Sequence, residues 1–513
     1  QVTAAAPSPR PSGQPQRRAK VGASVRGAPT VIMLGAAMSA LAAGTFDAFS
    51  SAFSHLHPVY YIFVPYWALI MGAFCLSPLT ILLPQYLQGK LSWPSKKDIP
   101  DEWTINGKKY DLTPFYDSHP GGSWALRAAK GSDCTGLFES YHLFISREVL
   151  LKMLAKYEIK TDGQQVEEPP MVFYDKFYED LKATVRDYFK GKGKGAHKMT
   201  VPHMALCFLA WSTMWAMIYG ILFKDAMWCI PFVGCLSWYL TGNVMHDASH
   251  NAFVTSPALN RIFAHAAFPY GVNVSGWHIQ HVMSHHIYTN AESDVDLYHF
   301  DPIVTLQKGA GHVNMALHIL RLTLILSTAV MHLCLIVPYA LLFGQIDPVP
   351  GHRMYDRIKA IAAHRAELRF EMAMELAALF AYFGVCWFQH GLIKGICVQL
   401  SIYTISSYLF CFFTQVSHLQ EECFLDNDEM KKLSFAKRQV STSMDFAADS
   451  AFWGHVSGGL NTQAIHHCFP SVSAMHLRAL YPRFRKVCKE HGVQLKEAHS
   501  LTDFVWGFVQ FAN

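Results

Sequence analysis

Histidines gather in three short segments that lie far apart in the chain. Pairs spaced four positions apart share one face of a helix, and such pairs occur in the first two segments. Neutral imidazole is a good ligand for Fe, Zn, Cu and Ni. Eight imidazoles exceed what one ion needs, so the pattern predicts a centre of two metal ions. The candidate ligands are His246, His250, His281, His285, His286, His418, His466 and His467.

The helical period predicts how the second segment divides its histidines. His281 and His285 are four positions apart, so an α-helix places them on one face. His286 lies about 100° further round such a helix than His285. We therefore expect His286 to be available to a second ion.

The third segment adds an oxygen donor. Gln463 precedes the two adjacent histidines of this segment by three and four positions, so its side chain can reach the same centre. Carboxylate-rich di-iron bundles instead use paired Glu-x-x-His motifs. Here that spacing occurs around Glu139 and His142, outside the three segments, which disfavours that class.

Other polar residues near the segments need a separate interpretation. Single histidines at a membrane edge are expected to be interfacial or hydrogen-bonded and not to be ligands; these are His278, His299, His318 and His455. Three acids either orient the imidazoles or are simply solvated, and the sequence leaves this choice open: Asp247, Glu292 and Asp294.

The composition indicates a membrane protein. Of the 513 residues, 51% are hydrophobic, and several apolar runs are long. The net charge of +5 is too small and too dispersed to indicate a nucleic-acid partner. Twelve cysteines without any C-x-x-C pair disfavour a zinc ribbon or a disulfide framework, so we expect reduced thiols.

The position of the metal ligands constrains the membrane topology. A metal centre cannot be shared across about 30 Å of hydrocarbon, so all three segments must face the same side. Polar residues and Pro338 interrupt residues 315–343, which we predict to be interfacial or re-entrant. Four core spans in two hairpins then leave every histidine segment on one face. The predicted spans are residues 201–223, 226–244, 371–392 and 396–416.

The beginning of the chain differs from the rest. Residues 1–30 are rich in Ala, Pro, Ser, Gly and Arg and contain no acid, which predicts a disordered or targeting segment. Residues 31–90 form an N-terminal hydrophobic segment. Within it, residues 58–83 are long enough for a membrane helix with aromatic residues at the interface.

Residues 91–160 are soluble and charged. Asn106-Gly107 between β-prone residues predicts a hairpin turn. His119 begins a His-Pro-Gly-Gly motif, and His142 follows downstream. This segment resembles the cytochrome b5 haem domain, whose two axial histidines lie in such motifs. The resemblance implies that His119 and His142 bind the iron of haem b from opposite faces, a closed site that suits electron transfer.

The predicted fold class combines two domains. A small α+β haem domain precedes an all-α membrane domain, which occupies residues 201–513 and has four core transmembrane helices and a cytosolic cap bearing the histidine segments. Residues 161–200 are polar and basic, and we expect a linker on the membrane surface.

The order of the motifs resembles the membrane front-end fatty acyl desaturases fused to cytochrome b5. The resemblance rests on H-D-x-x-H, Q-H-x-x-x-H-H and Q-x-x-H-H, on Tyr288-Thr289-Asn290 and on Gly458-Gly459-Leu460-Asn461, and it covers about residues 95–500. Ile465 is a departure, because family members often carry Glu there. On a helix this position faces away from the ligands, so we expect a milder consequence than the loss of a histidine.

The resemblance implies an activity. A di-iron centre uses O2 to remove two hydrogens from an acyl chain, between an existing double bond and the carboxyl end. No catalytic residue separate from the metal ligands is expected. Electrons come from an NAD(P)H-cytochrome b5 reductase through the fused haem, and the substrate is a fatty acyl lipid or acyl-CoA. The implied location is the endoplasmic reticulum with sites facing the cytosol, and plastid-type targeting is the alternative.

Three alternatives remain open from the sequence. A sphingolipid long-chain-base desaturase has a similar haem domain and similar histidine motifs. A di-iron lipid hydroxylase is a second alternative, because hydroxylation and desaturation share the first hydrogen abstraction. A membrane-anchored haem electron carrier with vestigial histidine clusters is the alternative that is not an enzyme. Two irons per chain beyond the haem exclude the carrier, and fatty acid profiling separates acyl from sphingoid substrates. The position of the new double bond is not determined by the motifs.

Overall fold

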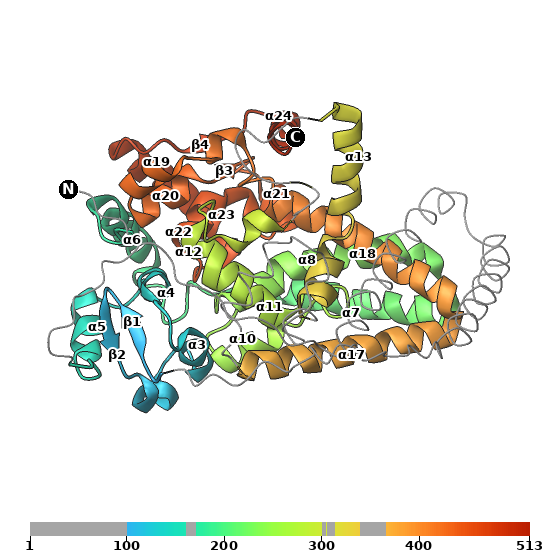
Figure 1. The fold of residues 1–513 in the computed structure, drawn as a ribbon, viewed down its shortest axis with the longest axis horizontal. Helices are drawn as coiled ribbons and strands as arrows, with labels where there is room; N and C mark the ends of the chain where they lie inside the picture. Colours follow the sequence, from blue (N-terminus) through green and yellow to red (C-terminus); the bar gives the residue numbers. More distant parts are fainter. Residues whose placement is uncertain (1–99, 161–170, 300–303, 305–312, 339–365) are drawn as a thin grey trace, which may run out of the picture. The chain divides into compact units, whose positions relative to one another are not determined.

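The computed structural model describes residues 100–160, 171–299, 304, 313–338 and 366–513. The predicted segments 1–30 and 31–90 therefore lie outside the described residues, as does the beginning of the predicted linker. The described residues are mostly helical, with two small two-stranded sheets. A small α+β domain precedes a helical domain with several apolar helices, as the sequence predicted at this level (Figure 1).

The small domain is built on a β-hairpin. Asn106 and Gly107 have φ of 51° and 75°, the left-handed values that a tight hairpin turn requires, and the predicted turn is confirmed. Trp103 and Tyr110 lie opposite each other on the two strands and are buried against the helices that follow. The elements are β1 (Trp103–Ile105), β2 (Lys108–Tyr110), η1 (Thr113–Ser118), α3 (Ser123–Ala129), α4 (Thr135–Tyr141) and α5 (Arg147–Leu154).

The predicted linker over residues 161–200 is wrong in its centre. Residues Lys176–Phe189 form helix α6, and Phe177, Leu181 and Val185 on one of its faces are buried. Apolar residues four positions apart form the stripe of an amphipathic helix, which the surrounding charged residues obscured in the sequence. Helix α6 packs against α20 (Phe435–Ser441) and α23 (Ala474–Glu490), so it belongs to the large domain.

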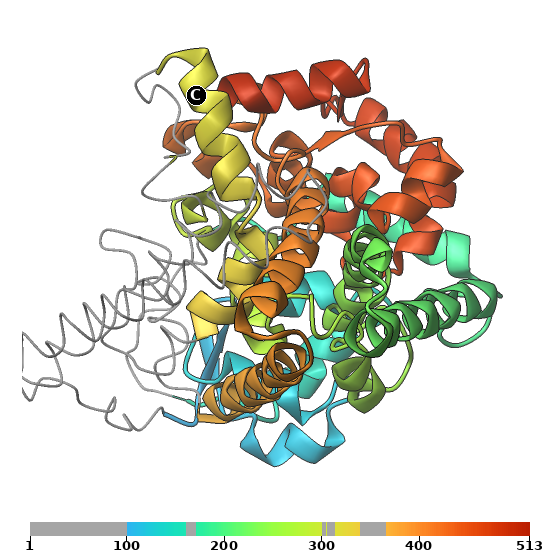
Figure 2. The ribbon, with the colours of Figure 1, turned by 90° about the vertical axis from the view of Figure 1, so that its right-hand side faces the viewer.

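The large domain contains several long apolar helices. Within the described residues, three helices are long and apolar enough to cross a membrane: α7 (Val201–Lys224), α17 and α18 (Leu392–Thr414). Helix α17 runs over Ala366–His390. Helix α8 (Ile230–Leu240) continues without a break through η3 (Thr241–Met245) into α9 (His246–Ser249). Figures 1 and 2 show the elements that follow α18, dark orange to red, gathered on one side of these helices.

Two of the connections between these helices lie together. The turn between α7 and α8 contains Asp225, and α18 begins two residues before Lys394. Lys394 Nζ donates a hydrogen bond to Asp225 Oδ1 at 2.5 Å. The two predicted hairpins, α7 with α8 and α17 with α18, therefore turn at the same end.

The segment that we predicted to be interfacial or re-entrant is bent. Helices α13 (Met315–Leu326) and α14 (Ala329–Met331) belong to two helical parts that meet at 44°. Counted as one span, this bent pair raises the number of candidate spans in the described residues to four. The bend agrees with a segment that does not cross the membrane as one straight helix.

The remaining elements are short, and some of them carry histidines of the second and third segments. In chain order they are η2 (Met227–Cys229), α10 (Pro257–Phe263), α11 (Val274–Trp277), η4 (His278–His285), α12 (His286–Tyr288), η5 (Val295–Tyr298), η6 (His332–Ile336), η7 (Glu421–Cys423), α19 (Asn427–Lys432), β3 (Met444–Asp445), α21 (Ala451–Ser457), η8 (Leu460–Thr462), α22 (Gln463–Cys468), β4 (Lys496–Glu497) and α24 (Leu501–Phe511). Strands β3 and β4 pair in parallel. All eleven cysteines in the described residues are free thiols, as expected.

Candidate metal centre

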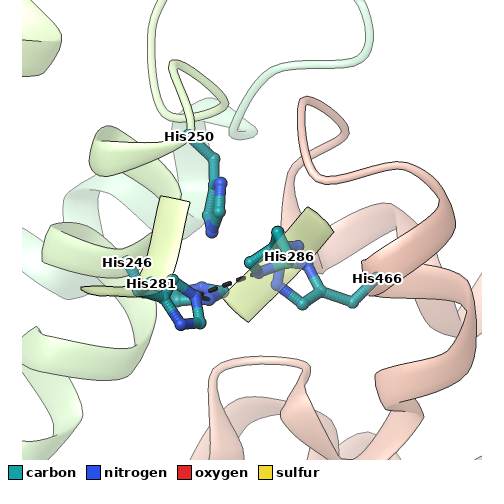
Figure 3. A group of neighbouring side chains, drawn as sticks. All are labelled: His246, His250, His281, His286 and His466. Carbon is teal, nitrogen blue, oxygen red and sulfur yellow. Dashed lines mark hydrogen bonds between the residues drawn. The ribbon is translucent and has the colours of Figure 1, made fainter. Parts of the chain in front are cut away.

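Five of the predicted ligands form one buried cluster. One nitrogen from each ring lies within 4.8 Å of those from the other four. Figure 3 shows the rings converging on a common centre, with the α22 side chain facing those from the α9 and η4–α12 segments. We call this group the five-histidine cluster: His246, His250, His281, His286 and His466.

The nitrogen atoms at the centre of this cluster are not satisfied by the protein. Nε2 of His281 lies 3.2 Å from Nε2 of His246 and 3.0 Å from Nε2 of His286. An imidazole nitrogen has one proton or one in-plane lone pair, so it cannot pair well with both neighbours. Nε2 of His250 and of His466 is buried without a hydrogen-bond partner in the described part of the chain. A cation that accepts these lone pairs removes the cost of burying them unpaired.

A π-helix decides which histidines of the second segment meet. Residues His278–His285 form the π-helical turn η4, in which hydrogen bonds join residues five positions apart. His281 and His286, five positions apart, therefore lie in one cluster. The α-helical prediction placed His281 and His285 on one face, whereas in the structure His281 lies in the same five-residue group as His286. His285 belongs to a second cluster, although it also lies near His281.

The other three predicted histidines form the three-histidine cluster: His285, His418 and His467. The Nδ1 atom of His418 donates to the carbonyl oxygen of Thr442 at 2.9 Å, and that of His467 donates to Oε1 of Gln439 at 2.9 Å. A proton held on Nδ1 leaves the lone pair on Nε2, the arrangement of metal-binding histidines. Nε2 of His418 and of His467 is buried and has no hydrogen-bond partner among the described residues.

Two carboxylates orient the third member of this cluster. Nδ1 of His285 lies 3.0 Å from Asp294 Oδ2 and 3.5 Å from Asp296 Oδ2. Burial lowers the pKa of His285, but these two carboxylates outweigh burial and raise the pKa to about 9. The same negative charges also favour a metal cation, which would displace the proton from Nε2 on binding. Of the acids left open by the sequence, Asp294 orients the His285 ring, whereas Asp247 accepts a hydrogen bond from Ser473 Oγ at 2.6 Å.

The two clusters are in direct contact through helix α22. His466 and His467 are consecutive, and each belongs to a different cluster. The ring of His467 stacks on that of His286, with centroids 4.2 Å apart and an interplanar angle of 12°. Burial, reinforced by neighbouring imidazoles, holds the pKa of His466 and of His467 well below the ordinary value. Both rings are therefore neutral, the form that binds metals.

Helix α22 also presents the predicted oxygen donor. Oε1 of Gln463 is buried and has no hydrogen-bond partner among the described residues. Ile465 is fully buried in an apolar cluster with side chains of α6, α20 and α23. The structure therefore agrees with the expectation that Ile465 packs away from the ligands.

The histidines predicted not to be ligands lie outside both clusters. Nδ1 of His278 is paired with the carbonyl oxygen of Val274 at 2.9 Å, and Nε2 of His318 with that of Val509 at 2.9 Å. The ring of His455 stacks on that of His203, and His299 belongs to neither histidine cluster. Hydrogen bonding therefore accounts for the positions of the His278 and His318 rings, and stacking accounts for that of His455.

The small domain brings the rings of its two predicted haem ligands close together. The ring centroids of His119 and His142 lie 6.2 Å apart, which leaves room for one metal ion bonded to both at about 2 Å. Nδ1 of His119 is paired with the carbonyl oxygen of Gly122 at 3.0 Å, and Nδ1 of His142 with that of Phe138 at 2.7 Å. Both Nδ1 atoms therefore carry the proton and both Nε2 atoms have a free lone pair, so these residues fit a haem iron.

Glycine is required in the loop that holds the first of these histidines. A Cβ atom on Gly121 would lie 2.8 Å from Cε1 of His119, too close for a carbon contact. The glycine after His119 and Pro120 thus lets the imidazole lie against its own loop. This close contact gives a physical reason for the first glycine of the His-Pro-Gly-Gly motif.

The geometry agrees with comparisons to known proteins. Residues 226–498 match the model "Fatty acid desaturase", and residues 90–161 match "Cytochrome b5-like Heme/Steroid binding domain". The chain belongs to the fatty acid desaturase family. It is an oxygen-dependent oxidoreductase associated with membranes, and its family uses iron. The cytochrome b5-like domain adds haem and electron transfer.

Named relatives match this desaturase over most of their length. An acyl-lipid omega-13 desaturase of Chlamydomonas reinhardtii is 27% identical over 82% of this chain and 94% of the relative. An acyl-lipid (8-3)-desaturase of Physcomitrium patens is 28% identical over 77% of this chain and 84% of the relative. A probable Delta(5) fatty acid desaturase of Dictyostelium discoideum is 31% identical over 76% of this chain and 86% of the relative.

Sequence reasoning missed the residues that orient the ligands. Thr442 acts through its backbone, and nothing in a side chain signals that role. Gln439 lies in a helix with no motif of its own. Asp296 follows Asp294 by two positions within the acidic stretch after the second histidine segment, and this spacing was the one available signal.

Proposed function

We propose that this desaturase is a front-end enzyme. It introduces a double bond between an existing double bond and the carboxyl end of a polyunsaturated fatty acyl chain. The single observation that carries the proposal is the contact between two buried imidazole clusters, with eight histidines in all, in a chain that also bears a bis-histidine haem domain. The relatives named as (8-3)- and Delta(5)-desaturases support the choice of substrate.

The histidines hold two iron ions in this proposal. The five-histidine cluster binds one ion and the three-histidine cluster binds the other, with Gln463 as a further oxygen donor. When bound, the iron pair with O2 supplies an oxidant strong enough to take hydrogen from an unactivated C–H bond. Asp294, Gln439 and the Thr442 carbonyl hold the imidazoles of the three-histidine cluster in one orientation.

His119 and His142 hold haem b as the electron relay. A haem iron bonded on both faces has no open position for substrate, so its chemistry is electron transfer. The electron donor is an NAD(P)H-cytochrome b5 reductase. Fusion of the haem domain to the desaturase raises the effective concentration of the relay at the iron centre.

The proposed topology has four core spans. They are α7, the segment from Ile230 to Met245, α17 and α18, and the bent α13–α14 segment does not cross the bilayer. The contact between Asp225 and Lys394 supports two hairpins that turn on the same side. All histidine segments then face the cytosol at the endoplasmic reticulum, where a reductase reaches the haem. Cysteine-accessibility mapping tests this, and residues 250 and 467 on opposite sides would exclude it.

The decisive experiment is expression in a host that lacks polyunsaturated fatty acids, with feeding of defined acids. Gas chromatography with mass spectrometry should find a new double bond on the carboxyl side of an existing one. Iron analysis of the purified chain should find two irons beyond the haem. A modified sphingoid base would identify a long-chain-base desaturase instead, and a hydroxylated lipid would identify a hydroxylase. Haem without further iron would identify an electron carrier.

A further inference from the structure

A tyrosine of the haem domain contacts a candidate iron ligand of the large domain. The hydroxyl of Tyr141 lies 2.6 Å from Nδ1 of His250, and their rings are nearly parallel, at 26°. His250 belongs to the five-histidine cluster, and its Nε2 is the buried atom without a hydrogen-bond partner in the described residues. With Nε2 bonded to a metal, Nδ1 carries the proton and donates to the phenol oxygen.

The same tyrosine is covalently joined to a candidate haem ligand. Tyr141 is the last residue of α4, and His142 follows it directly. A continuous route of covalent bonds and one hydrogen bond therefore runs from the ring of His142, along the backbone to the ring of Tyr141, and on to the ring of His250. No residue of another element intervenes on this route.

Close packing next to this route keeps the two domains together. A Cβ atom on Gly136, in the first turn of α4, would lie 2.5 Å from Cγ2 of Ile287. Ile287 directly follows His286 in the five-histidine cluster. Only glycine lets α4 come this near to the metal centre.

A second contact lies on the other haem-ligand loop. The ring of Trp124, in α3, meets the ring of His278 edge-on at 4.5 Å, and the guanidinium of Arg261 lies 3.9 Å from the centre of the Trp124 ring. A cation over an indole face is an attractive contact. The haem domain thus contacts the large domain through both helices next to its histidines.

We propose that Tyr141 is the positioning residue that couples the haem to the iron centre through His142 and His250. The inference rests on the proposed function. In each transfer one electron leaves ferrous haem, which becomes ferric, and reduces one ferric iron to ferrous. A reduced nicotinamide, acting through a flavoprotein reductase, returns the haem to the ferrous state. Tyr141 itself is neither oxidised nor deprotonated, because it provides only the bonded route and the docked geometry.

The test measures the haem and not the product. The purified full-length, haem- and iron-loaded protein is reduced anaerobically and mixed with O2 and acyl substrate in a stopped-flow instrument. Re-oxidation of the haem is followed by its absorbance. Tyr141→Phe retains the ring and removes the hydroxyl, and Tyr110→Phe makes the same change in the hairpin core of the same domain. We expect Tyr141→Phe to slow re-oxidation roughly tenfold or more, the usual effect of losing an outer hydrogen-bond partner at a metal site, and Tyr110→Phe to match the wild type.

Two further measurements separate coupling from folding. The haem spectrum, the rate of haem reduction by the reductase and the iron content should be unchanged in Tyr141→Phe. Gly136→Val, which pushes α4 away from Ile287 without altering the tyrosine, should also slow re-oxidation while the haem spectrum is retained. Wild-type re-oxidation rates in both variants would overturn the inference. A loss of iron from Tyr141→Phe in proportion to the slower rate would also overturn it, because the tyrosine would then only hold a ligand.

The results that would refute this inference differ from those that would refute the proposed function. If O2 and substrate do not accelerate haem re-oxidation in the wild type, the haem does not serve the iron centre, and the proposed function is wrong. If they do so equally in the wild type and in Tyr141→Phe, only the role of the tyrosine is wrong.

Discussion

The Nε2 atoms of His281 and His286 lie 3.0 Å apart, although an α-helix would turn these two side chains to different faces. The π-helical turn over His278–His285 brings residues five positions apart together. Such turns are frequent at functional sites, because the extra residue re-aims the side chains at a local cost in stability. Here the turn sends His285 to one cluster and His286 to the other.

The histidine of α22 in the five-histidine cluster provides the first prediction. His466→Ala should reduce desaturation more than about 100-fold, since even the loss of an outer partner of a metal ligand costs 10- to 100-fold. Fatty acid profiles of the expressing host measure this. The haem absorbance should be unchanged. His455→Ala removes a histidine that lies outside both clusters, and it should retain wild-type activity. Substantial activity in His466→Ala would contradict the ligand assignment.

The haem ligands provide the second prediction. His119→Ala removes one of two imidazoles that face each other 6.2 Å apart, so the purified protein should lose its characteristic haem absorbance. Desaturation supported by the reductase should fall sharply, because the electron route then begins without its carrier. The iron content of the clusters should remain. A spectrum identical to that of the wild type would refute the axial role.

The carboxylate beside His285 provides the third prediction. Asp294→Asn keeps the shape of the side chain but removes the charge that orients the imidazole, and it should weaken iron binding by about 10- to 100-fold. Iron retained after dialysis against a graded series of chelator concentrations measures this. The matched control is Asp449→Asn, because Asp449 is an exposed acid. Equal iron retention in the two variants would exclude an orienting role for Asp294.

Gly458, which lies just before η8, provides the fourth prediction. A Cβ atom on Gly458 would lie 2.5 Å from the backbone of Gly242, four positions before His246. Gly458 and Gly492 have nearly the same φ, 66° and 64°, but Gly492 faces open space. Gly492→Ala should therefore cost about 1–2 kcal/mol for the left-handed backbone alone. Gly458→Ala should cost a further 1–3 kcal/mol or so from overpacking.

Thermal unfolding in detergent compares the two variants. The larger decrease in melting temperature should belong to Gly458→Ala, with loss of iron before loss of haem, because Gly242 and Gly458 bring the first and third histidine segments together. Equal decreases for the two variants would show that the contact with Gly242 contributes nothing beyond the backbone strain.

Much of the site follows from residue types and local spacing. Imidazoles and a glutamine within single helical turns already specify the kind of centre, and the Asn106-Gly107 turn and the His119 loop depend on neighbours in sequence. Helix α6 shows a limit of this reasoning. Its apolar stripe is regular, but the many charges between the apolar residues are also typical of a solvated linker, and only the packing against α20 and α23 distinguishes the two.

The sequence alone determined that eight imidazoles and one amide are available for metals, that two further histidines are available for a haem, and that several segments are apolar enough for a membrane. The tertiary structure alone decided which imidazoles share a cluster, which atoms hold their Nδ1 protons, and that Tyr141 contacts His250. The physical reason is that residue spacing defines faces only within one regular helix. Which imidazoles from different helices meet depends on a π-helical turn, on backbone carbonyls and on close glycine contacts. None of these features follows a regular residue spacing that can be recognised in the sequence.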